Sequence, residues 1–172
     1  VETIRTYLEA FFHGLPVEIC MTSPPVRLID SEKDFYLKSR KKWHLKRKAL
    51  EGVSHLEVFS VLDALSAHLI EPHDYCLVAL TDAPLCEEWI DDEDGTENVS
   101  AVMGRACGDR VCIVNTDASV KTLLATISHE LLHCFGLDHC TSFRCLMNSH
   151  AVEGDDCLFL SPLNLKKWIV GV

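Results

Sequence analysis

The sequence lacks any long uninterrupted run of apolar residues, although 48% of its 172 residues are hydrophobic. A membrane-spanning helix needs about 18 to 20 consecutive apolar residues, so no membrane partner is expected. Positive charge is also scarce, because 16 lysines and arginines stand against 26 aspartates and glutamates, a net charge of −10. Phosphate backbones are bound by basic surfaces, and this balance therefore argues against nucleic acid as a partner.

The first residues, VETIRTYLEAFFHGL, lack the basic and then continuously apolar layout of a secretory signal. The chain nevertheless contains nine cysteines, which is a high and odd number. Disulfide frameworks are typical of secreted proteins, whereas metal ligands and thiols are more common in reducing compartments. We therefore expect an intracellular, cytoplasmic protein, monomeric, whose cysteines are ligands or thiols.

Hydrophobic periodicity divides the chain into helices and strands. Helices are expected at 1–13, 55–70, 118–135 and 162–170. Strands are expected at 16–21, 75–81, 99–106 and 111–116. This order predicts an α/β (α+β) fold in one compact domain over residues 1–172, with a mixed sheet of about four to five strands and an antiparallel edge strand. The part after Gly136, residues 137–160, should be irregular, and a short helix should end the chain.

Two segments carry dense charge of one sign. The basic KSRKKWHLKRK, residues 38–48, could bind nucleic acid or direct localisation. Because Trp43 and Leu45 interrupt it, a solvated helix or loop packed by its aromatic ring is the favoured interpretation. The acidic EEWIDDEDGTE, residues 87–97, is expected to be an exposed loop, since dense like charge resists burial.

The stretch HELLHCFGLDHCTSFRCLM, residues 129–147, contains three histidines and three cysteines. His129 and His133 share one face of an expected helix, about 6 Å apart along its axis. Two imidazoles so placed can bind one zinc ion. His139 could supply the third ligand of a catalytic zinc site if the helix ends at Gly136 and the chain turns back, a turn that glycine permits at little steric cost.

Glu130 follows the first histidine, as the general base does in the pattern H-E-x-x-H. Zinc lowers the pKa of a bound water to about 7, so that a carboxylate can remove its proton near neutral pH. The short pattern arises by chance in many helices, where its histidines are merely satisfied polar groups. The added glycine and third histidine make chance a poor explanation, and a catalytic zinc site is the prediction.

HELLHCFGLDH fits HExxHxxGxxH, the zinc signature of metzincins, and the tail CTSFRCLM resembles the C-x4-C-x-M of archaemetzincins, a family of minimal zinc metalloproteases. The segments LTDAPLCEEW, VMGRA and RVCIVNT are similar to further parts of that family, so the likeness covers about residues 55–172. The resemblance implies a compact metzincin-like domain, with an N-terminal part at about 1–136 and a C-terminal part at about 137–172. It further implies that the catalytic zinc is bound by His129, His133 and His139, with Glu130 as general base, Gly136 at the turn and Met147 in the Met-turn.

The resemblance also implies a second zinc ion held by four cysteines, two from the C-x4-C and two from a later C-x-x-C. Cys140 and Cys145 supply the first pair. At the place of the second pair, the segment SPLNLKKW has Ser161 and Asn164, and neither residue type is a normal zinc ligand.

A third thiolate for this second zinc could come from Cys157, with His150, Cys134 or a residue that the sequence does not identify as the fourth ligand. Alternatively the second zinc is absent, and the cysteines of this part are thiols or a disulfide pair. The remaining cysteines lie in or beside apolar runs and are expected to be small buried core residues. They are Cys20, Cys76, Cys86, Cys107 and Cys112.

The sequence therefore predicts a zinc-dependent metallopeptidase that uses Zn²⁺, with Glu130 acting on zinc-bound water. Its substrate would be a peptide or unfolded protein, which the resemblance places antiparallel to an edge strand. The alternative is a catalytically weak or inactive zinc-stabilised binding protein of the same fold. Glu130 favours catalysis, because metal binding alone would not require it. A nucleic-acid binder acting through residues 38–48 finds little support in the overall acidity.

Overall fold

The computed structural model describes residues 2–15, 17–20, 34–36, 42–66, 74–107, 110–149 and 157–171. The helices within these ranges are α1 (Glu2–Phe11), α2 (Val58–Ser66), α3 (Val120–Cys134) and α4 (Pro162–Val170). The strands are β1 (Asp34–Tyr36), β2 (Lys42–His44), β3 (Arg47–Leu50), β4 (Val53–Glu57), β5 (Leu77–Thr81), β6 (Leu85–Ile90), β7 (Glu97–Val102), β8 (Gly104–Cys107) and β9 (Val111–Asn115). The mixed α+β fold predicted from the sequence is confirmed.

The strands form a four-stranded sheet in the order β3-β4-β6-β7, a three-stranded sheet in the order β5-β9-β8, and the pair β1-β2. Each of the two larger sheets is mixed, because β4 runs parallel to β6 and β5 runs parallel to β9, while the other pairs are antiparallel. The sequence suggested a single mixed sheet, whereas the structure divides the strands between two. As expected, an antiparallel edge strand, β8, lies beside β9.

The second expected helix starts later than its periodicity suggested. Residues 53–57 are strand β4, and α2 begins only at Val58. The reason is the buried Glu57, whose carboxylate accepts hydrogen bonds from the backbone N–H groups of Phe59 (3.0 Å) and Ser60 (2.8 Å). These bonds satisfy the first amides of the helix and fix its start, which the apolar pattern alone could not place.

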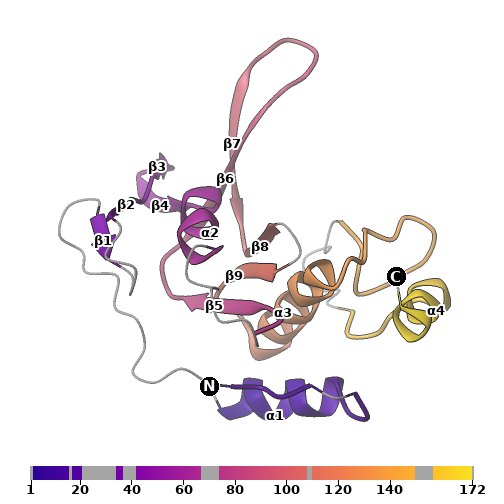
Figure 1. Ribbon diagram of the computed structural model, residues 1–172. Helices are drawn as coiled ribbons and strands as arrows, with labels where there is room; N and C mark the ends of the chain where they lie inside the picture. Colours follow the sequence, from indigo (N-terminus) through magenta and orange to yellow (C-terminus); the bar gives the residue numbers. More distant parts are fainter. Residues whose placement is uncertain are drawn as a thin grey trace.

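The acidic segment 87–97 lies at the end of a β-hairpin. Its prediction as an exposed loop holds for residues 91–96, whereas residues 87–90 and 97 belong to strands β6 and β7. Strands β6 and β7 pair from Leu85↔Val102 to Ile90↔Glu97 and project from the body of the molecule (Figure 1). The carboxylates of Asp91 and Asp94 accept backbone N–H groups within the turn, and Gly95 adopts a φ of 72°. A projecting hairpin keeps its charged side chains in water, so like charge does not prevent strand formation.

Four further sequence predictions need correction. Residues 17–20 form no strand, and the rest of the expected strand 16–21 lies outside the described residues. The described part of the basic segment, residues 42–48, belongs mainly to β2 and β3 rather than to a helix or loop. The expected strand 99–106 is interrupted at Met103, whose carbonyl accepts the backbone N–H of Asn115. Of the cysteines expected in the core, Cys86 and Cys112 are buried and Cys76 is half-buried, whereas Cys20 and Cys107 are exposed.

Strand β9 forms the centre of the core, since all five of its residues are buried. Val111 and Ile113 pack with α2 and the β4–β6 region, while Val114 packs with α1 and α3. Helix α3 lies along the three-stranded sheet, and the segment after it leads to α4 (Figure 1). No helix in the described part of the chain has the length and apolar character that a membrane span requires.

Candidate metal centre

Helix α3 positions the first two histidines, and its ends are fixed by local sequence. Ser119 caps the N-terminus by accepting the backbone N–H of Thr122 at 3.1 Å. At the C-terminus, Gly136 has a φ of 82°, its N–H donates to His133 O, and the N–H of Leu137 donates to Leu132 O. This is the Schellman arrangement, which needs a left-handed residue at the glycine position. The chain therefore leaves the helix sharply and returns along its side.

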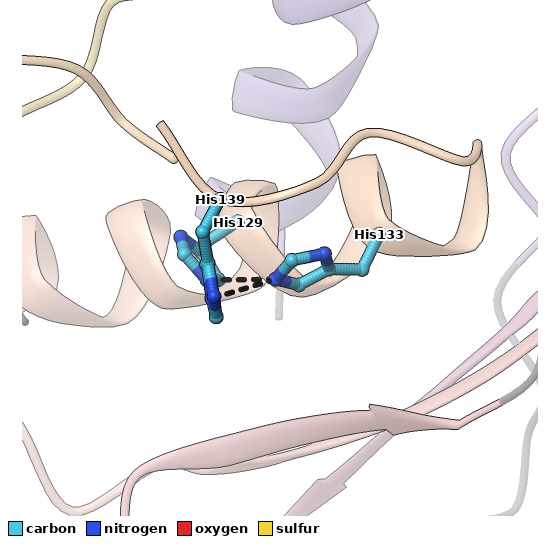
Figure 2. A group of neighbouring side chains, drawn as sticks. All are labelled: His129, His133 and His139. Atoms are coloured by element: carbon cyan, nitrogen blue, oxygen red, sulfur yellow. Dashed lines mark hydrogen bonds between the residues drawn. The ribbon is translucent and has the colours of Figure 1, made fainter. Parts of the chain in front are cut away.

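The return brings His139 onto His129 and His133 (Figure 2). The Nε2 atoms of the three rings lie 3.0 Å (His129 and His133), 3.1 Å (His133 and His139) and 3.3 Å (His129 and His139) apart. Two nitrogens bound to one tetrahedral zinc ion at about 2.0–2.1 Å lie about 3.3–3.4 Å from each other. The three imidazoles are thus spaced as ligands of a single ion. The structure confirms that these residues could hold a metal.

Backbone carbonyl groups orient the two helical histidines. The Nδ1 atom of His129 donates to Leu146 O, and the Nδ1 atom of His133 donates to Leu137 O, each at 2.7 Å. A neutral imidazole has one N–H, so these bonds leave both Nε2 atoms as unprotonated lone pairs. Metal-binding histidines commonly have their other ring nitrogen fixed in this way.

The rings are also held in the neutral state that a metal requires. Burial lowers the pKa of His129 to about 4, although the Leu146 carbonyl acts in the opposite direction. Burial lowers the pKa of His133 as well. At neutral pH, the Nε2 atoms of His129 and His133 therefore carry no protons with which to bond each other. A cation is the partner that such a set of acceptors favours.

Glu130 lies between α3 and the edge strand β8 and is only 7% exposed. Burial raises the pKa of its carboxyl group to about 7, while the Arg105 guanidinium and a hydrogen bond with the Ala106 backbone oppose the shift. The contact with β8 is close, because a Cβ atom placed on Gly104 would lie 3.2 Å from Glu130 Cγ. A buried carboxyl group that titrates near pH 7 can both accept and donate a proton under neutral conditions.

Arg105 was not singled out from the sequence, yet it joins the two larger sheets beside this carboxyl group. Its guanidinium forms an ion pair with Glu87 on β6 at 2.9 Å and lies 5.8 Å from the centre of the Phe59 ring. Sequence spacing could not pair residues 87 and 105, because their contact depends on how the two sheets pack.

Met147, which the resemblance assigns to a Met-turn, is fully buried in a turn that follows the histidine segment. It packs with Leu132 of α3 and with Leu137, and its carbonyl accepts the N–H of Cys140 at 2.6 Å. Asn148, another residue missed from the sequence, ties the same segment together. Its side chain accepts the N–H of Cys145 at 2.7 Å and donates to the carbonyls of Cys140 and Phe143.

The structure brings Cys140 and Cys145 together with Ser161 and Asn164, but not with Cys157. Within the described ranges, the three histidines are the only group of three potential ligands whose atoms all lie within 4.8 Å of one another. The Cys157 thiol donates instead to Phe159 O. Of the fourth ligands considered, Cys134 lies at the end of α3 beside Cys112, and His150 lies outside the described residues.

Comparison of the chain with models of protein families, with curated proteins and with solved structures finds no match. The site must therefore be interpreted from its own residues and geometry.

Proposed function

We propose that the protein is a zinc-dependent metallopeptidase of the archaemetzincin type, which hydrolyses peptide bonds in peptides or unfolded proteins. One observation carries the proposal: the Nε2 atoms of three imidazoles converge at the spacing of metal ligands, and the residue after the first histidine is a buried glutamate with a pKa of about 7. Three protein ligands and an open fourth position are typical of catalytic zinc, whereas structural zinc sites are closed by four.

His129, His133 and His139 are the proposed ligands, and Glu130 is the proposed general base. The zinc ion would polarise the scissile carbonyl and lower the pKa of a coordinated water to about 7. Glu130 takes a proton from the attacking water and delivers it to the leaving amine. A cation at the histidines lowers the pKa of Glu130 from its metal-free value, which favours the carboxylate as the resting form.

Strand β8 is the proposed site for the substrate backbone. It pairs with β9 on one side, and no described strand pairs with its other side. An extended peptide can add to such an edge through main-chain hydrogen bonds. Because Glu130 packs against Gly104 of this strand, a peptide bound there would lie near the general base.

The experiment compares zinc content and peptide hydrolysis in the native protein and in Glu130→Gln, using a mixed library of quenched fluorescent peptides. Glu88→Gln is a matched control, since Glu88 lies on β6 and pairs with Lys48 away from the histidines. We expect the Glu130 variant to retain zinc and to lose about 10²- to 10⁴-fold in hydrolysis, the usual contribution of a general base. The control should retain both.

Equal hydrolysis by the native protein and Glu130→Gln would refute the role of Glu130. Zinc bound by the three histidines without hydrolysis of any library member would instead support the zinc-stabilised binding protein. Loss of zinc in His133→Ala, compared with its retention in His55→Ala, tests the ligand assignment, because His55 lies on β4 outside the cluster.

A further inference from the structure

Two buried cysteines, Cys140 and Cys145, follow the third histidine in the chain. Cys140 follows His139 in the chain, and Cys145 precedes Met147 by two residues. Their side chains are 6% and 2% exposed, and neither cysteine forms a disulfide. Ser161 and Asn164, from the start of α4, are 1% and 3% exposed and complete the cluster. Two thiols, a hydroxyl and a carboxamide therefore meet away from water.

Hydrogen bonds satisfy this cluster internally. The sulfur of Cys145 accepts the backbone N–H of Ser161 at 3.1 Å, that of Met147 at 3.5 Å and the side-chain amide of Asn164 at 3.6 Å. The sulfur of Cys140 lies 3.6 Å from the hydroxyl oxygen of Ser161. Since the amide of Asn164 presents an N–H to the sulfur, it offers a proton rather than a lone pair at this point.

Two of the distances between these side chains are nevertheless close to the ligand spacing of a tetrahedral metal site. Sulfur atoms bound to one zinc ion at about 2.3 Å lie about 3.8 Å from each other. The contacts from Cys140 to Ser161 and from Cys145 to Asn164 are both 3.6 Å. Serine and asparagine are poor zinc donors, so the residues present do not fit the second zinc that the resemblance implied.

The hydroxyl group of Ser161 also caps the N-terminus of helix α4. Its oxygen accepts the backbone N–H of Asn164 at 3.3 Å, and Pro162 occupies the first helical position. The same residue thus starts the helix and holds both sulfurs, through its hydroxyl and its backbone amide. These bonds connect α4 to the segment that carries His139 and Met147.

That segment in turn orients the histidine centre. The N–H of Cys140 donates to Met147 O, and the carbonyl of the neighbouring Leu146 accepts Nδ1 of His129. We propose that Cys140, Cys145, Ser161 and Asn164 occupy the four positions of a tetrahedral metal site but bind no metal. Their hydrogen bonds instead hold this segment in position. The native chain therefore binds one metal ion, at the histidines, and the substitutions Ser161→Cys and Asn164→Cys together create a second metal site.

The test is a titration with cobalt(II) and zinc of the native chain, of the double variant Ser161→Cys with Asn164→Cys, and of Ser161→Ala with Asn164→Ala as the control. Cobalt bound by thiolates shows intense near-ultraviolet charge-transfer absorption that a site of nitrogen ligands lacks. We expect no such absorption from the native chain or the alanine control. The cysteine variant should show it and should bind one more zinc ion per chain than the native protein.

Thiolate absorption from the native chain would overturn the proposal even if the double variant fails to fold. A folded cysteine variant that binds no more zinc than the native chain would overturn it as well. A separate measurement tests whether the cluster positions the histidine centre. Asn164→Ala should weaken zinc binding at the histidines about 10-fold or more, which is the effect expected for a residue that orients ligands indirectly. Its metal-free circular dichroism should stay native, and an unchanged zinc affinity would remove the positioning role.

Discussion

Replacement of Gly104 by alanine should disturb the contact between the edge strand β8 and the buried Glu130. A Cβ atom at this position would lie 2.9 Å from Thr126 Cγ2, 3.1 Å from the carbonyl oxygen of Ile113 and 3.2 Å from Glu130 Cγ. Carbon atoms in good contact are separated by about 3.5–4.0 Å. All three neighbours are therefore too close for a methyl group.

Each neighbour is held in place. The carbonyl of Ile113 belongs to the fully buried strand β9. The rotamer of Thr126 is fixed by a hydrogen bond of 2.9 Å from its hydroxyl to Thr122 O. Glu130 is buried against β8. Overpacking of this kind costs about 1–3 kcal/mol, and at about 2–4 °C per kcal/mol the melting temperature should fall by about 2–12 °C.

Urea unfolding of the metal-free protein, followed by circular dichroism, measures the stability loss. Thr126→Ser tests the closest of the three contacts, because it removes the Cγ2 atom of Thr126 and keeps the hydroxyl group. In the double variant with Gly104→Ala it should recover part of the lost stability, since two of the three close contacts remain. Under the proposed function, hydrolysis should fall about 10-fold or more, as a misplacement of about 1 Å can cost 10²-fold. Native stability of Gly104→Ala, or an absence of coupling to Thr126→Ser, would refute this account of the contact.

Three further predictions concern pH, the turn and the metal. The folded-state pKa of Glu130, about 7, exceeds its ordinary 4.5, so its contribution to stability is present below about pH 4.5 and is lost as pH rises through 7. Metal-free Glu130→Gln should therefore match the native stability near pH 4 and exceed it by up to about 3 kcal/mol at pH 8, and equal urea midpoints at pH 8 would contradict this. Asn148→Ala should destabilise the protein by about 1–3 kcal/mol, because it leaves the amide of Cys145 and two carbonyls without their partner. The control Asn98→Ala removes only one exposed hydrogen bond, to Thr96 O, and should change urea stability less. Zinc at 1,000 times its dissociation constant should raise unfolding free energy by about 4 kcal/mol, and a chelator should reverse the gain; an equal gain in a variant without His133 would place the metal elsewhere.

The histidine cluster could be predicted because its geometry is local. His129 and His133 share a helix face, and the turn at Gly136 returns the chain within six residues of His133 to His139. Helical spacing and glycine chemistry are sequence properties, so little depended on the rest of the fold. The orienting carbonyls of Leu137 and Leu146 could not be identified in the same way, because any residue supplies a carbonyl group.

The errors in the fold have a common physical cause. The start of α2 depends on a glutamate that caps the helix from the end of β4, although glutamate is not among the usual N-cap residues. The hairpin β6–β7 forms through pairing between its strands, which outweighs the repulsion expected from a dense run of acidic residues. In both cases tertiary or cross-strand contacts decided a boundary that periodicity and charge pattern could only approximate.

The role of Cys140 and Cys145 cannot be predicted from their spacing in the sequence alone. The C-x4-C spacing fits a metal site, but the same spacing also lets the Cys145 sulfur accept three N–H groups and lets the Cys140 amide bond Met147 O. Which role applies depends on the two partners that α4 supplies from residues 161 and 164. Because the hydrogen-bonded cluster and a zinc ion would hold the same segment beside His139, one could replace the other without moving the three histidines. The additional zinc ion bound by the double variant Ser161→Cys with Asn164→Cys measures directly whether a metal can replace the hydrogen-bonded cluster.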